Sequence, residues 1–315
     1  RHSAGNKHQT STEMKTTFKT MLALMAGALA FSACTRELTE NIIDEQPDLS
    51  ELKTMTFTAV HEKQEGATKA TIDSRDIKWS SGDALSVFDG IGNQEFSLDG
   101  DGGSTSGTFT GSAAEASSYY ALYPYAEGAS LSDSKIVSAV LPATQTATAG
   151  SADPAAMLMM ATSIDASTLS FKNVCAYVKV TPNFDCSRIE LTSKGEENLA
   201  GTLTLDCSDG TPVAEVTANG TGSIALTGTI SSGNTYYIAV LPSSLESGFV
   251  LRFFVDGDYY EKDMEQKLAL TRNNVMGLGS FSTSDLKFVG FNSVSIYSTT
   301  ISGDANQETG YGIAW

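Results

Sequence analysis

Short runs of alternating polar and apolar residues recur along most of the chain, at a spacing of roughly ten residues, and this pattern limits the folds that the chain can adopt. In the stretch 54–60, "TMTFTAV", the residues Met55, Phe57 and Ala59 fall on one face. Later runs include "ALSVF", "GTFTG", "YYALYP", "SKIVSAVLP", "RIEL", "GTLTL", "TYYIAVLP" and "FVLRFFV". Helical periodicity is almost absent after residue 33. The sequence therefore predicts an all-β fold of antiparallel strands.

The length of 315 residues is too great for one small β-sandwich, and an apolar content of 41% is sufficient for real cores. We expect two antiparallel β-sandwich domains, residues 51–181 and 182–315, that divide near Pro182. The run "VCAYVKVTP" would then be the last strand of the first domain.

The segment 14–37 has the three parts of a secretory signal. Lys15 and Lys19 are its basic start, and residues 21–33 form an apolar run that is shorter than the ~20 residues needed to span a bilayer. Cys34 directly follows Ser-Ala, as in a lipobox, although Phe31 stands where a branched residue is usual. We expect residues 1–33 to be upstream sequence and signal peptide, and Cys34 to carry lipid. An ordinary secretory signal with an incidental cysteine is the alternative.

Residues 34–50 are polar and acidic and are expected to form a tether. The whole chain has 20 basic and 37 acidic residues; residues 1–33 hold four and one of these, which leaves 16 against 36, a net charge of −20. A chain this acidic repels phosphate backbones, so we expect no nucleic-acid partner.

Three cysteines follow Cys34, so at least one of them is unpaired. Cys186 and Cys207 flank two runs, "SRIELTS" and "GTLTLD", that could form a hairpin. Cys186 is out of phase with the inward residues of its run, however, so a direct disulfide would need a β-bulge. Pairing of these two cysteines is left open.

The sequence offers little catalytic chemistry. His2 and His8 precede the signal, and His61 lies in "HEKQEGATK", where exposure is expected. There is no GxSxG, phosphate-binding loop or CxxC motif. Two converging carboxylates would suffice for a glycosidase, and the chain has many. We nevertheless expect no enzyme, no catalytic residue, no cofactor and no metal site.

Several motifs occur in one order along the chain: "KWSSGDALSVF", "YYALYPYAEG", "LPATQTATAGSADPAAMLMMATS", "LSFKNVCAYVKVTP" and "LTRNNVMGLGSF". Together they resemble the Bacteroidetes fimbrillin-like (Mfa-like) family over residues 51–282. Asn173 stands where the family has histidine, and Met276 where it has an aromatic residue. Each motif taken alone is also explained by ordinary packing of a β-strand in a core.

The resemblance implies a subunit of lipoprotein-dependent (type V) pili with two transthyretin-like β-sandwich domains. In that family a protease cuts after a basic residue, the first strand is lost, and a strand of a neighbouring subunit fills the groove. The candidate cut sites here are Lys69 and Arg75, with an uncut loop as the alternative. An arginine-specific protease would choose Arg75.

Candidate donor strands lie near residue 300 and beyond. "NSVSIYSTT" alternates through Val294 and Ile296, and "TGYGIAW" through Tyr311, Ile313 and Trp315. Both could equally be native edge strands of the second domain.

The functional expectation is a structural subunit of a cell-surface fimbria at the outer membrane. Its partners would be related pilin subunits, a processing protease, and the membrane through a palmitate-type lipid on Cys34. The alternative functions are a tip adhesin, an anchor subunit or a monomeric surface lipoprotein that binds glycan or host protein. Tyrosines that could stack on sugars are Tyr119, Tyr120, Tyr123 and Tyr125, of which alternate ones should be buried.

Overall fold

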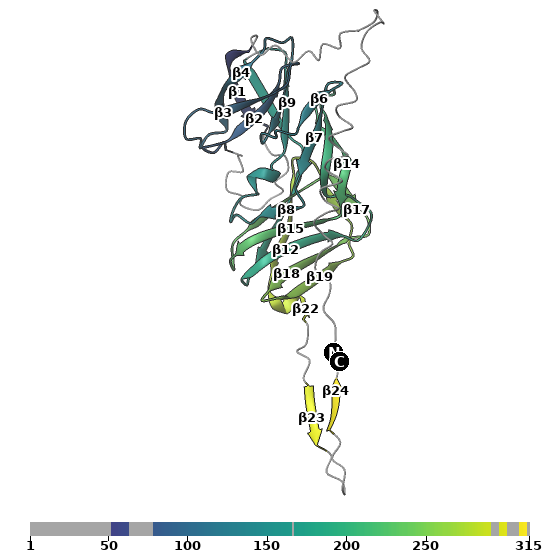
Figure 1. The fold of residues 1–315 in the computed structure, drawn as a ribbon. Helices are drawn as coiled ribbons and strands as arrows, with labels where there is room; N and C mark the ends of the chain where they lie inside the picture. Colours follow the sequence, from purple (N-terminus) through teal and green to yellow (C-terminus); the bar gives the residue numbers. More distant parts are fainter. Residues whose placement is uncertain (1–51, 63–77, 166, 291–295, 301–308, 314–315) are drawn as a thin grey trace, which may run out of the picture. The chain divides into compact units, whose positions relative to one another are not determined.

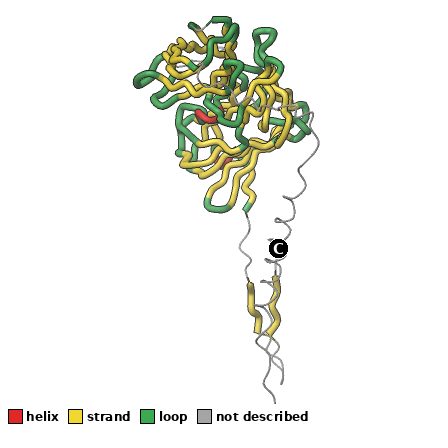
Figure 2. Tube along the Cα trace, turned by 45° about the horizontal axis from the view of Figure 1, so that its top comes forward, coloured by secondary structure: helices red, strands yellow, loops and turns green. Residues whose placement is uncertain are grey.

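The computed structural model describes residues 52–62, 78–165, 167–290, 296–300 and 309–313 (Figure 1). The chain separates into two compact units, residues 1–46 and 47–315, and every described residue belongs to the second. The fold is all-β, as predicted, and Figure 2 shows strands joined by loops with only brief helical turns. Within the described ranges, those turns are the 3-10 segments Pro154–Ala156 and Thr283–Asp285. Among the described residues, no helix is long and apolar enough to cross a membrane.

The first part of the fold is a closed barrel in the order β1-β10-β9-β5-β2-β3-β4. Its strands are β1 (Lys53–His61), β2 (Ala84–Phe88), β3 (Asn93–Leu98), β4 (Ser106–Ala113), β5 (Tyr119–Tyr123), β9 (Met159–Ser163) and β10 (Thr168–Asn173). Closure leaves no unpaired edge, and it requires β1 to pair with strands on both sides.

Large aromatic side chains fill the barrel. Period-2 alternation sends Phe57 and Ala59 of β1 inward, where both are fully buried, and the polar residues between them outward. The buried aromatic residues are Phe57, Trp79, Phe96, Phe109, Tyr119, Tyr123 and Phe171. The predicted inward face of residues 54–60 is thereby confirmed.

The second part contains several smaller sheets. A six-stranded sheet has the order β22-β19-β18-β12-β15-β8, a four-stranded one β14-β13-β7-β6, and a three-stranded one β16-β11-β21. The strands of the six-stranded sheet are β8 (Thr144–Thr146), β12 (Cys186–Ser193), β15 (Ser223–Ile230), β18 (Phe249–Val255), β19 (Asp258–Met264) and β22 (Lys287–Val289). The remaining strands of the four- and three-stranded sheets and of the pair β17-β20 are β6 (Ser130–Ser132), β7 (Lys135–Leu141), β11 (Ala176–Pro182), β13 (Ala200–Asp206), β14 (Val213–Thr221), β16 (Tyr236–Val240), β17 (Ser243–Leu245), β20 (Leu268–Leu270) and β21 (Val275–Phe281).

Sheet membership does not follow the boundary that we expected at residues 181 and 182. β6, β7 and β8 precede that boundary, yet β7 pairs with β13 and β8 pairs with β15. β11, expected as the last strand of the first domain, pairs with β16 and β21. Order along the chain does not predict which strands pair, because packing between distant segments decides their partners. The division into two transthyretin-like domains remains a prediction.

The outer face of the barrel packs against the second core. Phe88, Leu122 and Met160 come from β2, β5 and β9, and all three belong to the buried cluster that the second part builds. These strands are therefore buried on both faces, which explains their continuous apolar sequence.

The strands of the candidate donor segments pair with each other. β23 (Ile296–Thr300) and β24 (Thr309–Ile313) form an antiparallel ladder in which Ile296 is opposite Ile313. Within the described ranges, neither strand pairs with any other. Val294 and Trp315 lie outside the described residues, so their role stays a prediction.

The cysteines do not form the disulfide that we left open. Cys175, Cys186 and Cys207 are buried and unpaired. The expected hairpin is wrong because β12 pairs with β15 and β18, while β13 pairs with β14 and β7. A register shift between Cys186 and Arg188 nevertheless supplies the bulge that brings Cys186 inward.

Candidate functional site

The candidate site is the position of β1 between β4 and β10, which we name the first-strand slot. β1 runs antiparallel to β4 from the Lys53–Ala113 pair to the Val60–Ser106 pair. It runs parallel to β10 up to the pair of His61 with Phe171. Without β1, both neighbours would expose a row of unpaired backbone donors and acceptors.

Inward side chains of β1 close the aromatic core. The ring of Phe57 meets those of Phe96 and Tyr119 edge-to-face, with centroids 5.4 and 5.2 Å away. Burial of an apolar side chain such as Phe57 contributes about 1.5–3 kcal/mol, so withdrawal of β1 would expose several such surfaces together.

The facing strand β4 shapes the slot by alternating small and large residues. Gly111 and Gly107 lie opposite Met55 and Ala59, while Phe109 lies opposite Phe57. A Cβ atom on Gly107 would come within 2.8 Å of the Trp79 ring, and one on Gly111 within 2.5 Å of the Glu95 carbonyl oxygen. The slot therefore accepts a strand of defined side-chain sizes.

Trp79, from the "KWSSGD" motif, lies against β1. Its indole Nε1 donates a hydrogen bond to the carbonyl oxygen of Ala59 at 3.2 Å, and its ring packs edge-on against Phe109, Tyr123 and Phe171. Gly102, with φ of +77°, lets the turn after β3 approach, since a Cβ there would be 2.4 Å from the Trp79 carbonyl oxygen. The motif thus fixes the indole against β1.

His61 is not the exposed loop residue that we expected. It is the last residue of β1, its ring lies 3.9 Å from that of Trp79, and its Nδ1 is 3.2 Å from the sulfur of Met159. The expectation failed because the strand continues to His61 rather than ending at Val60. Burial lowers the pKa of His61 from 6.5 to about 4, so the ring is neutral at pH 7.

Glu62, directly after β1, joins the slot to the second part of the fold. Its backbone N–H donates to the Phe171 carbonyl oxygen at 2.9 Å. Its Oε1 accepts from the Asn173 backbone N–H at 2.6 Å and from the Arg272 guanidinium, whose Nη2 lies 3.3 Å from Oε2. Arg272 also donates to the Asn173 carbonyl oxygen at 2.8 Å. The Glu62 carboxylate is therefore held by a bidentate contact with the Arg272 guanidinium and by one backbone N–H.

The turn "LTRNN" positions that arginine. Asn273 adopts a left-handed conformation with φ of +59°, which asparagine tolerates, and its backbone N–H donates to the Cys175 carbonyl oxygen. The buried side chain of Asn173 donates to Asn273 Oδ1 at 2.7 Å. Asn173 thus binds the turn that carries Arg272.

The opposite end of β1 carries a much more exposed ion pair. Lys53 and Glu115 lie 2.9 Å apart, with 61% and 72% of their side chains exposed, against 22% and 20% for Arg272 and Glu62. The two ends of one strand therefore offer a strong and a weak electrostatic contact.

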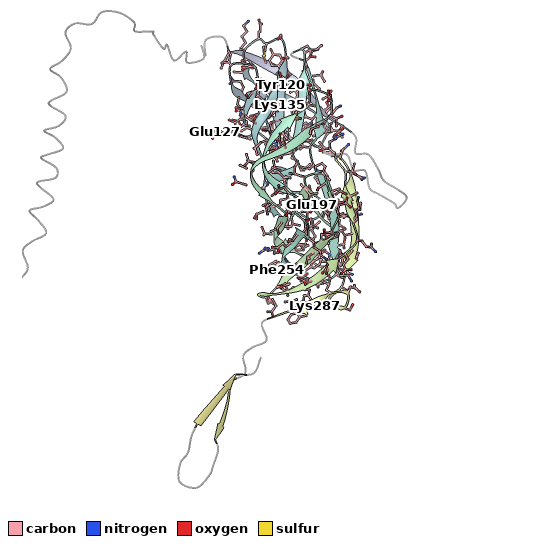
Figure 3. The ribbon with its side chains drawn as sticks, turned by 90° about the vertical axis from the view of Figure 1, so that its right-hand side faces the viewer. Tyr120, Glu127, Lys135, Glu197, Phe254 and Lys287 are labelled. Carbon is pink, nitrogen blue, oxygen red and sulfur yellow. The ribbon has the colours of Figure 1, made fainter. Side chains whose placement is uncertain are left out.

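The remaining predicted residues separate into two groups. Cys34, Lys69 and Arg75 lie outside the described residues. Tyr119 and Tyr123 are buried in the barrel, so they do not form a sugar platform. Tyr120, labelled in Figure 3, is half-buried and lines an open pocket of about 390 Å³ with Ile164 and Cys207.

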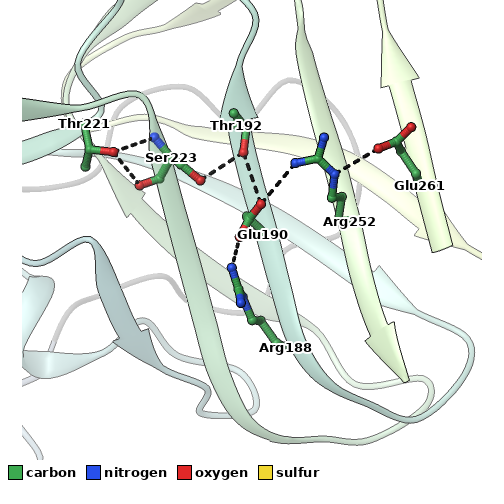
Figure 4. A network of polar contacts seen from close by, with 7 residues as sticks. All are labelled: Arg188, Glu190, Thr192, Thr221, Ser223, Arg252 and Glu261. Carbon is green, nitrogen blue, oxygen red and sulfur yellow. Dashed lines mark hydrogen bonds and ion pairs between the residues drawn. The ribbon is translucent and has the colours of Figure 1, made fainter. Parts of the chain in front are cut away.

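Another polar network lies on the six-stranded sheet (Figure 4). Glu190 accepts from Arg188 and, at 3.1 Å, from Arg252, which also bonds Glu261 at 2.9 Å. Across the described part of the chain, no group of three or more His, Cys, Asp and Glu side chains is arranged to hold a metal ion.

Sequence reasoning missed Glu62, Arg272 and Trp79 as parts of one site. The motifs "KWSSGD" and "LTRNN" were recognised, but no role was assigned to them. Arg272 is 210 positions from Glu62 along the chain, so no local pattern could join them.

Comparison with known proteins gives distant structural likeness only. No family model and no curated protein matches the chain. A candidate cell adhesion protein from Bacteroides ovatus is 14% identical, with 75% of this chain and 95% of that chain covered and a TM-score of 0.46. One from Bacteroides uniformis is 17% identical, with 76% and 96% covered and a TM-score of 0.45. A fimbrial protein from Bacteroides ovatus is 12% identical, with 81% and 54% covered and a TM-score of 0.33.

Proposed function

We propose that this protein is a structural subunit of a cell-surface fimbria, and that it polymerises by exchange of its first strand. The observation that carries the proposal is the position of β1. It is the first described strand, it completes a closed barrel between β4 and β10, and its inward side chains fill an aromatic core. A strand from a second subunit could satisfy the same backbone groups and the same pockets.

The proposal gives the N-terminal region a sequence of roles. Lipid on Cys34 would hold the chain at the outer membrane during export. A cut at Lys69 or Arg75, in the segment after β1, would then release the anchor together with the strand.

Proteolysis of the purified full chain tests the proposal. An arginine-specific protease should cut at Arg75 and a lysine-specific one at Lys69, and SDS-resistant ladders should follow. Mass spectrometry would identify the new N-terminus. Lys69→Gln should block the cut by the lysine-specific protease, and Arg75→Gln the cut by the arginine-specific one. For each variant, the other protease should still cut and serves as the control. No cleavage within residues 63–77 and no ladder would contradict the proposal.

Lipid attachment is tested separately with Cys34→Ser. Cells that express the native chain should incorporate labelled palmitate into it, whereas cells that express the variant should not. A chain that carries lipid and is never cut would instead be an anchor subunit or a monomeric surface lipoprotein. N-terminal sequencing of the protein from the cell surface separates these outcomes.

A further inference from the structure

We propose that Arg272 and the backbone N–H of Asn173 form a carboxylate-binding site at one end of the first-strand slot, and that the incoming strand of a partner subunit must place a carboxylate there. The inference rests on the proposed function, because it concerns what replaces β1. It specifies a chemical requirement on that partner beyond a match of apolar side chains.

The site already shows what it binds. Both oxygens of Glu62 are engaged, one by Asn173 N–H at 2.6 Å and by Arg272 Nη1, the other by Arg272 Nη2 at 3.3 Å. Nη1 also donates to the Asn173 carbonyl oxygen at 2.8 Å, which helps to hold the guanidinium in place. A planar fork that faces a carboxylate is selective for that shape over a neutral amide.

Because the site is largely buried, the loss of β1 would leave the charge of Arg272 without a partner anion. Only 22% of the Arg272 side chain is exposed while Glu62 is present. A cut after Lys69 or Arg75 would remove Glu62 with β1, and Arg272 would lose the anion that compensates its charge. The emptied slot therefore retains a cation and a backbone donor that favour an anionic occupant.

The backbone register fixes where the carboxylate must be. Glu62 comes directly after His61, the residue opposite Phe171, and its own N–H bonds to the Phe171 carbonyl oxygen. Toward the N-terminus from Glu62, the inward-facing residues of β1 are His61, Ala59, Phe57 and Met55. The partner strand should thus read as alternate inward residues, small where Ala59 lies, followed at once by an anionic group.

Two sources could supply that anion: an acidic side chain, as in β1, or the main-chain carboxylate at the end of a strand. Neither "NSVSIYSTT" nor "TGYGIAW" contains Asp or Glu. A strand with either sequence could meet the requirement only through a terminal carboxylate, which a peptide experiment can offer or withhold.

The test uses the full chain after cleavage between residues 63 and 77, with labelled synthetic strands added in competition. The reference peptide is "KTMTFTAVHEK", residues 53–63, blocked at both ends. Its variants carry Glu62→Gln or Lys53→Gln. The second substitution is a matched control, because it removes the exposed ion pair at the other end of the same strand. Each peptide is measured on the native chain and on Arg272→Gln and Arg272→Lys chains.

The Glu62→Gln peptide should bind the native slot about 10-fold more weakly than the reference, while Lys53→Gln should change binding less than about 2-fold. On the Arg272→Gln chain the penalty for Glu62→Gln should fall below about 2-fold. The Arg272→Lys chain, which keeps the charge without the fork, should be intermediate. Thermal unfolding before cleavage confirms that each chain folds. "TGYGIAW" as a free acid should bind more tightly than its amide if a terminal carboxylate suffices.

Equal binding of the reference and Glu62→Gln peptides on the native chain would overturn the carboxylate site and leave strand exchange intact. A penalty that persists unchanged on Arg272→Gln would also overturn it. Failure of every peptide to enter the slot would overturn both this inference and the proposed function.

Discussion

The barrel and the six-stranded sheet are built from similar strands, but the loss of one terminal strand would disrupt the barrel far more than the sheet. The barrel has no edge, so withdrawal of β1 opens it along two ladders at once. The six-stranded sheet ends in short edge strands, β8 and β22, each bonded on one side. A closed sheet is therefore the more vulnerable to loss of a single strand, and its closing strand β1 is the first strand that the structure describes.

The polar contacts of the two regions differ in the same sense. In the barrel, Glu62 at the end of β1 accepts from Asn173 and Arg272, whereas in the sheet Glu190 and Arg252 tie together the central strands β12 and β18. One set holds the strand that closes the barrel, and the other holds strands in the middle of an open sheet.

The largest expected effect is from Phe57→Ala, with Phe253→Ala as its counterpart in the second core. Both side chains are fully buried. Each substitution should lower the free energy of unfolding by about 3–5 kcal/mol, through lost burial and a residual cavity. Hydrogen exchange should show lost protection in β4 and β10 for Phe57→Ala, and in β12 and β19 for Phe253→Ala.

The comparison would break if Phe57→Ala loosened β12 as much as β10, since the two regions would then unfold as one. Chemical denaturation by two probes would detect this as a single coincident transition.

Acid should weaken the barrel selectively through His61. Its pKa of about 4 in the folded chain is below the usual 6.5, so the unfolded chain binds a proton more readily between these values. Stability should fall as pH drops from 6.5 to 4, by at most about 3 kcal/mol, and this contribution should be constant below pH 4. All three histidines lie at or before residue 61, so the second core has none.

The measurement is urea unfolding of the native and His61→Phe chains at several pH values. Phenylalanine keeps a ring against Trp79 and cannot titrate. A pH dependence that is the same in both chains would contradict the assignment.

Glu190→Gln tests the network on the six-stranded sheet. The carboxylate, with 13% of its side chain exposed, accepts from two guanidinium groups. Loss of these charge-assisted bonds should lower the free energy of unfolding by about 1–2 kcal/mol. Hydrogen exchange in β1 should be unchanged, because the network does not touch the slot; increased exchange there would show that the regions are coupled.

The smallest effect is expected for Glu115→Gln. Its partner Lys53 and the carboxylate itself are largely exposed, so the free energy of unfolding should not change measurably. High salt should leave the difference between this variant and the native chain near zero. A loss of stability as large as that of Glu190→Gln would mean that the start of β1 is held as firmly as its end.

Local pattern was sufficient to predict the strands but not their partners. The alternation of Met55, Phe57 and Ala59 predicts which side of β1 is buried, because side-chain direction has a period of two. The same pattern does not predict that β1 pairs in parallel with β10, or that β6, β7 and β8 belong to the sheets of the second core. Those choices depend on packing between segments that are far apart in sequence.

The site shows the same limit. Alternation placed β1, but the neutral state of His61 depends on the Trp79 ring and Met159, and the grip on Glu62 depends on Arg272. None of these contacts follows from spacing, since each is a tertiary approach. Asn173 illustrates the difference: the motif marked the position, and only the structure connects it to Asn273.

The long separations around β1 also set an order of assembly. Glu62 bonds Asn173, 111 positions later, and Arg272, 210 positions later. As the chain emerges from its N-terminus, β1 must wait for β10 and then for the "LTRNN" turn before its place is complete. Closing such distant contacts is slow. The barrel should therefore be among the late structures to form, and a newly synthesised chain would pass through a period in which its slot is open to strands other than its own.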